Sequence, residues 1–370
     1  MNFCENQTLE SLQGELRALY EQSGYAQYKM SKFEEYDLYV RNKDFLISDS
    51  VITFTDTNGK LMALKPDVTL SIIKNSGEAR AATQKVYYNE NVYRISKGTH
   101  TFKEILQSGL ECMGEIDDYC IYEVLSLACR SLKCIGKPAV LDVSHLGIVA
   151  AVLDDFCLPN AVKAQIVKCI DEKNCHEIER ICAENGIEKR GAERICALVQ
   201  LYGDPLDVIA KLRELFADES DCTALTQLET MMNAFAGTEL YEMLRLDFSV
   251  VSDMNYYNGF VFKGFVQGVP NSVLSGGQYD RLMQRLHRDF GAIGFALYLD
   301  ELERLLISDS GYDVDTVVLY EEGVSLAALS KALEELRANG QSVSAQRKKP
   351  EKLRYARLMK FENGEVKPLG

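Results

Sequence analysis

Side chains suited to binding a small charged molecule occur in three short stretches of the first third of the chain. Asp67 and Thr69 lie close together, Arg94 ends a stretch rich in tyrosine, and Gln107 and Glu111 are four residues apart. A carboxylate is a strong acceptor for an ammonium group, and a guanidinium can bind a carboxylate or a phosphate through paired hydrogen bonds. These residues could therefore form a pocket for an amino acid.

Each of these residues also has an ordinary structural explanation. Asp67 precedes a helical pattern, so its carboxylate could cap a helix instead of binding a ligand, or could do both. Arg94 could be a surface charge at the end of a strand. Gln107 and Glu111 would point to the same face of a strand because side chains alternate along it. A polar pair on one face, flanked by leucines, is unusual for a plain core.

Two further stretches carry residues of the same kind. Tyr256 and Tyr257 lie in an Asn-Tyr-Tyr-Asn-Gly stretch, and residues 275–280 read Ser-Gly-Gly-Gln-Tyr-Asp. Tyrosine hydroxyls can donate and accept hydrogen bonds, although a tyrosine pair on a strand is more often part of a core. The Gly-Gly stretch predicts a tight turn leading into a helix, where glycine lets the backbone approach a ligand.

The elements that must position these residues follow from the periodicity of the chain. Apolar residues at helical spacing predict helices over 6–24, 67–75 and 119–134, and β-rich runs predict strands over 85–94 and 105–114. Residues 51–65 predict a hairpin around Asn58-Gly59. Residues 147–236 predict an all-helical insertion, after which strands resume near 245–266. A strand over 291–297 is expected to lead into a helix over 299–308.

A polar, glycine-containing break at 308–311 predicts a domain boundary. The expected domains are a core over 1–308, including the helical insertion, and a small α/β unit over 312–370. In that unit a strand at 316–320, a helix at 326–339 and a strand at 342–345 predict a βαβ unit. A hairpin around Asn363-Gly364 is expected to follow. The fold class is therefore α+β, with an antiparallel sheet flanked by helices.

The composition narrows the classes of function. The 370 residues include 55 acidic and 41 basic ones, which gives a net charge of −14. Nucleic-acid binders usually concentrate positive charge, so a role on tRNA is not expected, and the short basic run 347–349 is interpreted as a solvated loop. No stretch is long and apolar enough to span a bilayer, and no secretory signal is present, so a cytoplasmic protein is expected. The 11 cysteines include no Cys-x-x-Cys pair, so no metal site is expected. No other cofactor is expected either.

The motifs at 64–69, 86–94, 107–111, 253–262 and 275–280 together resemble the catalytic core of histidyl-tRNA synthetases, over about residues 10–306. The resemblance implies a class II synthetase-like sheet and a histidine-binding pocket. The positions that match the family's histidine-binding residues are Asp67, Thr69, Arg94, Gln107, Glu111, Tyr256 and Tyr257.

The cations that the synthetase reaction needs are missing at the matching positions. Ser252 stands in place of an arginine that precedes the tyrosine motif, and Glu301 in place of the ATP-binding arginine of the last motif. The motif-two loop keeps only Lys97 and Lys103, and lysine does not reproduce a bidentate guanidinium. Each loss would remove electrostatic stabilisation of the transition state. The sequence therefore predicts a pocket without catalytic residues.

This combination resembles the regulatory subunits of ATP phosphoribosyltransferase, a synthetase-like family. The resemblance implies a non-catalytic protein that assembles with the short catalytic subunit of that enzyme in the first step of histidine biosynthesis. It also implies histidine as an allosteric effector and a core homodimer within a hetero-oligomer. The alternatives are a divergent histidyl-tRNA synthetase, or a synthetase paralogue that serves another partner.

Overall fold

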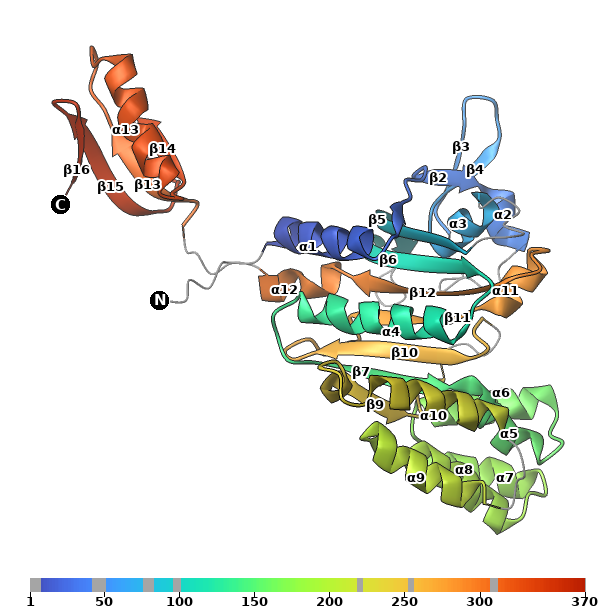
Figure 1. Ribbon diagram of the computed structural model, residues 1–370. Helices are drawn as coiled ribbons and strands as arrows, with labels where there is room; N and C mark the ends of the chain where they lie inside the picture. The colour runs from blue at the N-terminus through green and yellow to red at the C-terminus, as the bar shows by residue number, and fades with distance from the viewer. Residues whose placement is uncertain are drawn as a thin grey trace. The chain divides into compact units, whose positions relative to one another are not determined.

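The computed structural model describes residues 8–41, 51–75, 83–95, 101–217, 222–251, 256–306 and 312–369. The chain divides into two compact units (Figure 1): a large unit, Leu9–Leu305, and a small unit that contains Leu306–Gly370. The predicted boundary at 308–311 lies outside the described residues.

A nine-stranded sheet organises the large unit. In spatial order its strands are β1 (Ala26–Gln27), β5 (Gln84–Ile95), β6 (Phe102–Gly114), β12 (Gly291–Tyr298), β11 (Leu274–Gln278), β10 (Phe260–Val266), β7 (Ala139–His145), β9 (Leu244–Asp247) and β8 (Tyr202–Gly203). Neighbouring strands are antiparallel except for the pairs β1–β5 and β7–β9. The predicted α+β class, with a mainly antiparallel sheet flanked by helices, is confirmed.

Helices α1 (Leu9–Gln22) and α4 (Asp118–Lys133) pack on one face of this sheet (Figure 1). The Tyr20 hydroxyl of α1 lies 3.0 Å from the Ser131 hydroxyl of α4, and the Tyr20 ring packs against Tyr87 and Phe295 of the sheet. Because side chains alternate along a strand, the neighbours of these sheet residues point to the opposite face. That opposite face carries the polar residues singled out from the sequence.

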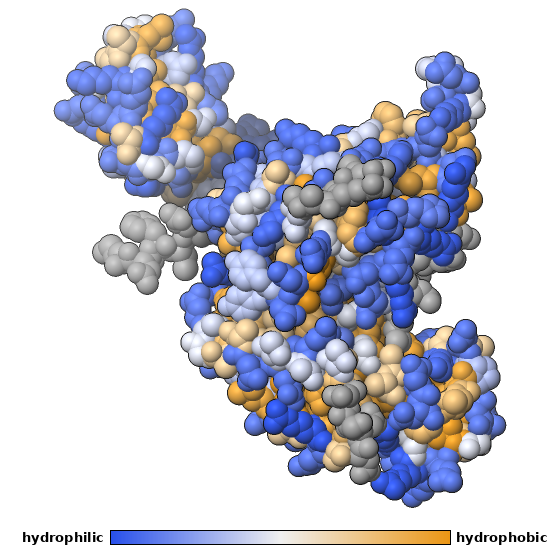
Figure 2. Space-filling model, turned by 45° about the vertical axis from the view of Figure 1, so that its right-hand side comes forward, coloured by the Kyte–Doolittle hydropathy of each residue, from blue (hydrophilic) through white to orange (hydrophobic). Residues whose placement is uncertain are grey.

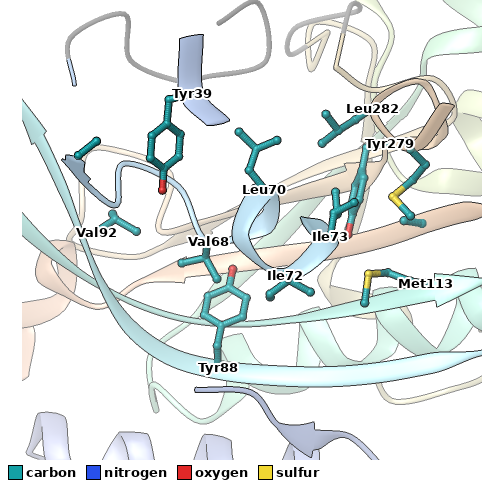
Figure 3. Packing of buried hydrophobic residues seen from close by; sticks show 13 residues of the cluster. Tyr39, Val68, Leu70, Ile72, Ile73, Tyr88, Val92, Met113, Tyr279 and Leu282 are labelled. Carbon is teal, nitrogen blue, oxygen red and sulfur yellow. The ribbon is translucent and has the colours of Figure 1, made fainter. Parts of the chain in front are cut away.

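A hydrophobic cluster on the opposite face fixes helix α3 (Thr69–Asn75). Helix α3 contributes Leu70, Ile72 and Ile73 to this cluster (Figure 3). The cluster also contains Tyr88 of β5 and Tyr279, the residue before α11 (Asp280–Arg285). A three-stranded sheet and a short helix pack nearby: β2 (Phe33–Glu35), β4 (Leu61–Leu64), β3 (Thr53–Thr55) and α2 (Tyr36–Arg41). The pairing of β3 with β4 confirms the predicted hairpin.

Helices follow one another through the predicted insertion. They are α5 (Leu146–Asp154), α6 (Asn160–Asp171), α7 (Cys175–Glu184), α8 (Lys189–Gln200), α9 (Pro205–Leu215) and α10 (Thr223–Phe235). The prediction that this region is all helical is wrong at β8, because Tyr202 and Gly203 pair with β9. A 3₁₀ turn, Tyr241–Met243, leads from α10 into β9.

The predicted tight turn over 275–280 is also wrong. Residues 274–278 form β11, which pairs with β10 on one side and β12 on the other. The glycines are needed there for close packing. A Cβ at Gly276 would lie 2.3 Å from the carbonyl oxygen of Gly294, and one at Gly277 would lie 2.7 Å from the carbonyl oxygen of Phe260.

The last elements of the large unit follow the predicted order. Strand β12 leads through a 3₁₀ turn, Asp300–Leu302, into α12 (Glu303–Leu306). The remainder of the helix predicted over 299–308 lies outside the described residues.

The small unit is a four-stranded sheet with one helix. Its strands, in spatial order, are β14 (Val343–Gln346), β13 (Val314–Leu319), β15 (Tyr355–Glu362) and β16 (Glu365–Pro368), and its helix is α13 (Leu326–Ala338). Strands β13 and β14 are parallel, which confirms the predicted βαβ unit. Asn363 and Gly364 both have positive φ, 52° and 86°, as the hairpin between β15 and β16 requires.

Hydrophilic residues cover much of the face shown in Figure 2. Within the described ranges, no helix is both long enough and apolar enough to cross a membrane.

Candidate functional site

One cavity of about 390 Å³ opens on the face of the large sheet opposite α1 and α4, and all seven predicted site residues line it. Asp67 and Thr69 come from the start of α3, Arg94 from the end of β5, and Gln107 and Glu111 from β6. Tyr256 and Tyr257 come from the segment before β10. The structure thus brings together residues from four separate parts of the chain.

Glu111 is the centre of the hydrogen bonding in this cavity. Its carboxylate accepts a hydrogen bond from the Thr69 hydroxyl at 2.7 Å and one from the Tyr279 hydroxyl at 2.5 Å. Burial raises the pKa of Glu111 to about 8, although both hydroxyls act in the opposite direction. A cationic ligand group would favour the ionised carboxylate, so Glu111 is placed to bind one.

Room for the Glu111 carboxylate depends on Gly294 of β12. The two residues are directly opposite in the β6–β12 pairing. A Cβ at position 294 would lie 1.8 Å from Oε2 of Glu111. The glycine at this position therefore belongs to the site, although it contributes no side chain.

Asp67 both caps a helix and faces the cavity, as the sequence allowed. Its Oδ1 accepts a hydrogen bond from the backbone N–H of Leu70 at 2.9 Å. Burial raises the pKa of Asp67, while the Leu70 N–H and the charge of Arg94 oppose that effect. Its second oxygen is not used by the cap, so the carboxylate can accept a further hydrogen bond from a ligand.

Arg94 is held against the segment that carries Asp67. Its Nε donates to the carbonyl oxygen of Pro66 at 3.0 Å. The preceding residue, Lys65, is fully buried and pairs with Glu90 at 2.8 Å. These contacts join β5 to the start of α3, and they leave the terminal nitrogens of Arg94 available to an anion.

The aromatic wall of the cavity consists of Tyr256, Tyr257 and Tyr279. The rings of Tyr256 and Tyr257 meet edge to face with centroids 4.6 Å apart, and Tyr279 lies 5.7 Å from Tyr256. Burial keeps the pKa of Tyr256 and of Tyr279 well above the usual value, so both hydroxyls stay protonated and can donate. The Gln107 amide makes no side-chain hydrogen bond within the described part of the chain, and it is only 3% exposed.

The segment after the tyrosine pair is fixed by two asparagine–aspartate hydrogen bonds. Asn258 Nδ2 donates to Asp280 Oδ2 at 2.8 Å, and the Asp280 N–H donates to Asn258 Oδ1 at 2.7 Å. Asp280 Oδ1 also accepts from the Ala292 N–H at 2.9 Å. The aromatic wall is therefore tied to α11 and to β12.

Besides Gly294, the lining residues that sequence reasoning did not assign to the site include Tyr279 and Lys263. Tyr279 was available as a signal, since it lies within the Gly-Gly-Gln-Tyr-Asp stretch, but its hydroxyl could not be assigned to Glu111 without the fold. Lys263 of β10 lines the cavity as well, and its position in an apolar strand offered no signal of its own.

Among the positions compared with the catalytic cations of synthetases, Ser252 and Lys97 lie outside the described residues. Lys103 lies near the start of β6, away from the cavity lining. Glu301 lies in the 3₁₀ turn after β12, where it accepts a hydrogen bond from Asn271 at 3.3 Å. The described cavity therefore offers acidic groups, neutral hydroxyls and two cations, which is a lining suited to a zwitterion.

The sequence model of the histidyl-tRNA synthetase family matches residues 4–302, so the chain belongs to that family. Among its relatives, the ATP phosphoribosyltransferase regulatory subunit of Oceanobacillus iheyensis is 26% identical over 286 residues, which are 76% of this chain and 70% of the relative. The corresponding protein of Clostridium kluyveri is 28% identical over 80% of this chain and 78% of the relative.

Solved structures share the fold. An ATP phosphoribosyltransferase regulatory subunit/histidyl-tRNA synthetase from Bacillus halodurans aligns with a TM-score of 0.76 at 24% identity and covers 91% of this chain and 88% of that one. These comparisons confirm the predicted synthetase-like fold, and the names of the relatives agree with the regulatory-subunit family that the sequence resembles.

Proposed function

We propose that the chain is a non-catalytic regulatory subunit of ATP phosphoribosyltransferase, and that its cavity senses free histidine. The observation that carries the proposal is the cavity itself: seven residues matching a histidine site converge on one buried acidic centre. The curated relatives named above are regulatory subunits of that enzyme. A chain of the ATP phosphoribosyl transferase (HisG:HisZ) complex from Thermotoga maritima has the same fold, with a TM-score of 0.63 at 17% identity.

The proposed pose assigns the ammonium group, the carboxylate and the ring of histidine to different parts of the lining. The ammonium group of histidine binds at Asp67, Thr69 and Gln107. There it can donate hydrogen bonds to the buried carboxylate of Asp67 and to the amide oxygen of Gln107. The carboxylate binds a cation of the lining, of which Arg94 is one. The imidazole lies against the tyrosine wall and bonds to Glu111, so that rings without a hydrogen-bonding nitrogen are rejected.

The partner is the short-form catalytic subunit of ATP phosphoribosyltransferase, which performs the phosphoribosyl transfer. The proposed assembly is a core homodimer of this chain within a hetero-oligomer, in the cytoplasm, without tRNA. Histidine bound in the cavity weakens the active complex, and by thermodynamic linkage the active complex weakens histidine binding by the same factor.

The protein is expected to form no histidyl-adenylate, because Ser252 and Glu301 stand where synthetases carry arginines. A carboxylate at position 301 would repel the triphosphate, and removing even one hydrogen-bond donor that stabilises a transition state typically costs about 2.7–4 kcal/mol. The measurement is histidine-dependent exchange of pyrophosphate into ATP, with an active histidyl-tRNA synthetase as the positive control. Exchange above the histidine-free background would favour the divergent synthetase instead.

A further inference from the structure

Lys263 lies where the cavity meets the helical insertion. In the sheet its neighbours are Ser275 of β11, which also lines the cavity, and Asp142 of β7. The Lys263 ammonium lies 3.6 Å from Oδ1 of Asp171, the last residue of α6. One side chain thus borders both the ligand site and the insertion.

The turn between α6 and α7 has a second, stronger attachment to the sheet. Lys173 in that turn has a left-handed φ of 52°, and its ammonium lies 2.8 Å from Oδ2 of Asp247 in β9. Asp247 is buried and also accepts hydrogen bonds from the N–H and the hydroxyl of Ser249. The turn is therefore anchored at Asp247, and the Lys263–Asp171 contact is a second point of attachment.

The Lys263–Asp171 contact is weak enough for Lys263 to replace Asp171 by another anionic partner. The side chains are 27% and 52% exposed, so the pair contributes little to stability. Asp171 also ends a helix, where the helix dipole disfavours a negative charge. An anion held inside the cavity, away from solvent, would be a better partner for the Lys263 ammonium than Asp171 is.

We propose that Lys263 exchanges Asp171 for the carboxylate of the bound amino acid, and that this exchange releases the α6–α7 turn from β10. The inference rests on the proposed histidine site and adds a route from that site to the helical insertion. Arg94 and Lys263 are the cations that line the described cavity, and Lys263 is the one on the β10 side, where the ligand carboxylate can meet it. The turn keeps its anchor at Asp247, so only partner contacts that need it held against β10 are weakened when histidine binds.

The test uses two variants and their combination, with calorimetry of L-histidine binding. Asp171→Asn removes the competing anion from outside the cavity and is expected to tighten binding by about two- to fivefold. Lys263→Gln is expected to weaken binding by about three- to tenfold. In the double variant, the gain from Asp171→Asn should vanish. Asp154→Asn is the matched control, because it breaks an exposed pair with Lys163 in the same insertion.

Two further measurements show whether Lys263 leaves Asp171 when the ligand binds, or only contacts the ligand. L-histidinol, which lacks the carboxylate, should bind wild type and Asp171→Asn equally well. Hydrogen exchange of the amides at 168–175 should rise when histidine binds the wild type, and it should already be high in Asp171→Asn without ligand. If histidine binds both proteins with equal affinity and this exchange is unchanged, the inference is wrong while the histidine site stands. If the wild type does not bind histidine at all, the ligand assignment and the inference both fail.

Discussion

Replacing Glu111 by glutamine is expected to lower the affinity for histidine by about ten- to a hundredfold. The substitution keeps the volume of the side chain but removes the charge that a cationic imidazole or ammonium group would meet in a buried site. Calorimetry at pH 8 measures the effect. Glu104→Gln is the matched control, since Glu104 lies on the same strand with an exposed side chain that pairs outside the cavity. Unchanged affinity for histidine in the Glu111 variant would show that Glu111 does not bind the ligand.

Without ligand, the Glu111→Gln variant should have a larger free energy of unfolding than the wild type. This difference between the two proteins should grow as the pH rises. The pKa of Glu111 is about 8 in the folded protein and 4.5 when unperturbed. Between these values the unfolded chain holds fewer protons at this residue, so folding stability is lost as the pH rises. Below pH 4.5 the effect is absent. Thermal unfolding of both proteins at pH 5 and pH 8 checks the sign, and a constant difference would contradict it.

Replacing Gly294 by alanine is expected to destabilise the large unit by about 1–3 kcal/mol and to abolish histidine binding. The new Cβ would lie 1.8 Å from Oε2 of Glu111 and 2.4 Å from the carbonyl oxygen of Leu110. The carboxylate could move away and leave Thr69 and Tyr279 without their acceptor, but the backbone oxygen is fixed in the β6–β12 pairing.

Urea unfolding measures the stability of the Gly294 variant. Gly14→Ala is the control, because Gly14 lies in α1 with no atom within 4 Å of a new Cβ. That change should stabilise the protein by about 0.5–1 kcal/mol through helix propensity. A Gly294 variant as stable as the wild type, with intact histidine affinity, would show that the β6–β12 spacing is looser than described.

The elements around the site could be predicted because their signals are local. Asp67 at a helix start, the hairpin at Asn58-Gly59 and the alternation that pairs Gln107 with Glu111 on one face depend only on neighbouring residues. The family motifs then placed these stretches in one pocket. The ligand itself stays a prediction.

What the sequence could not specify depends on long-range pairing. The Gly276-Gly277 pair has the composition of a turn, and only its position between β10 and β12 makes it a strand. Tyr279 meets Glu111 from 168 residues away, so no periodicity connects them. Lys263 looks like a solvent-facing lysine in an apolar strand until the sheet places it beside the cavity.

Reconstitution tests whether this chain regulates a separate catalytic subunit. The purified chain is mixed with the short ATP phosphoribosyltransferase subunit from the same cell, and the formation of phosphoribosyl-ATP is followed with and without histidine. We expect no activity from the chain alone, a higher turnover of the catalytic subunit when both are present, and inhibition by histidine that Glu111→Gln relieves. A catalytic subunit whose turnover is the same with and without this chain, and no complex by size-exclusion chromatography, would contradict the proposed function.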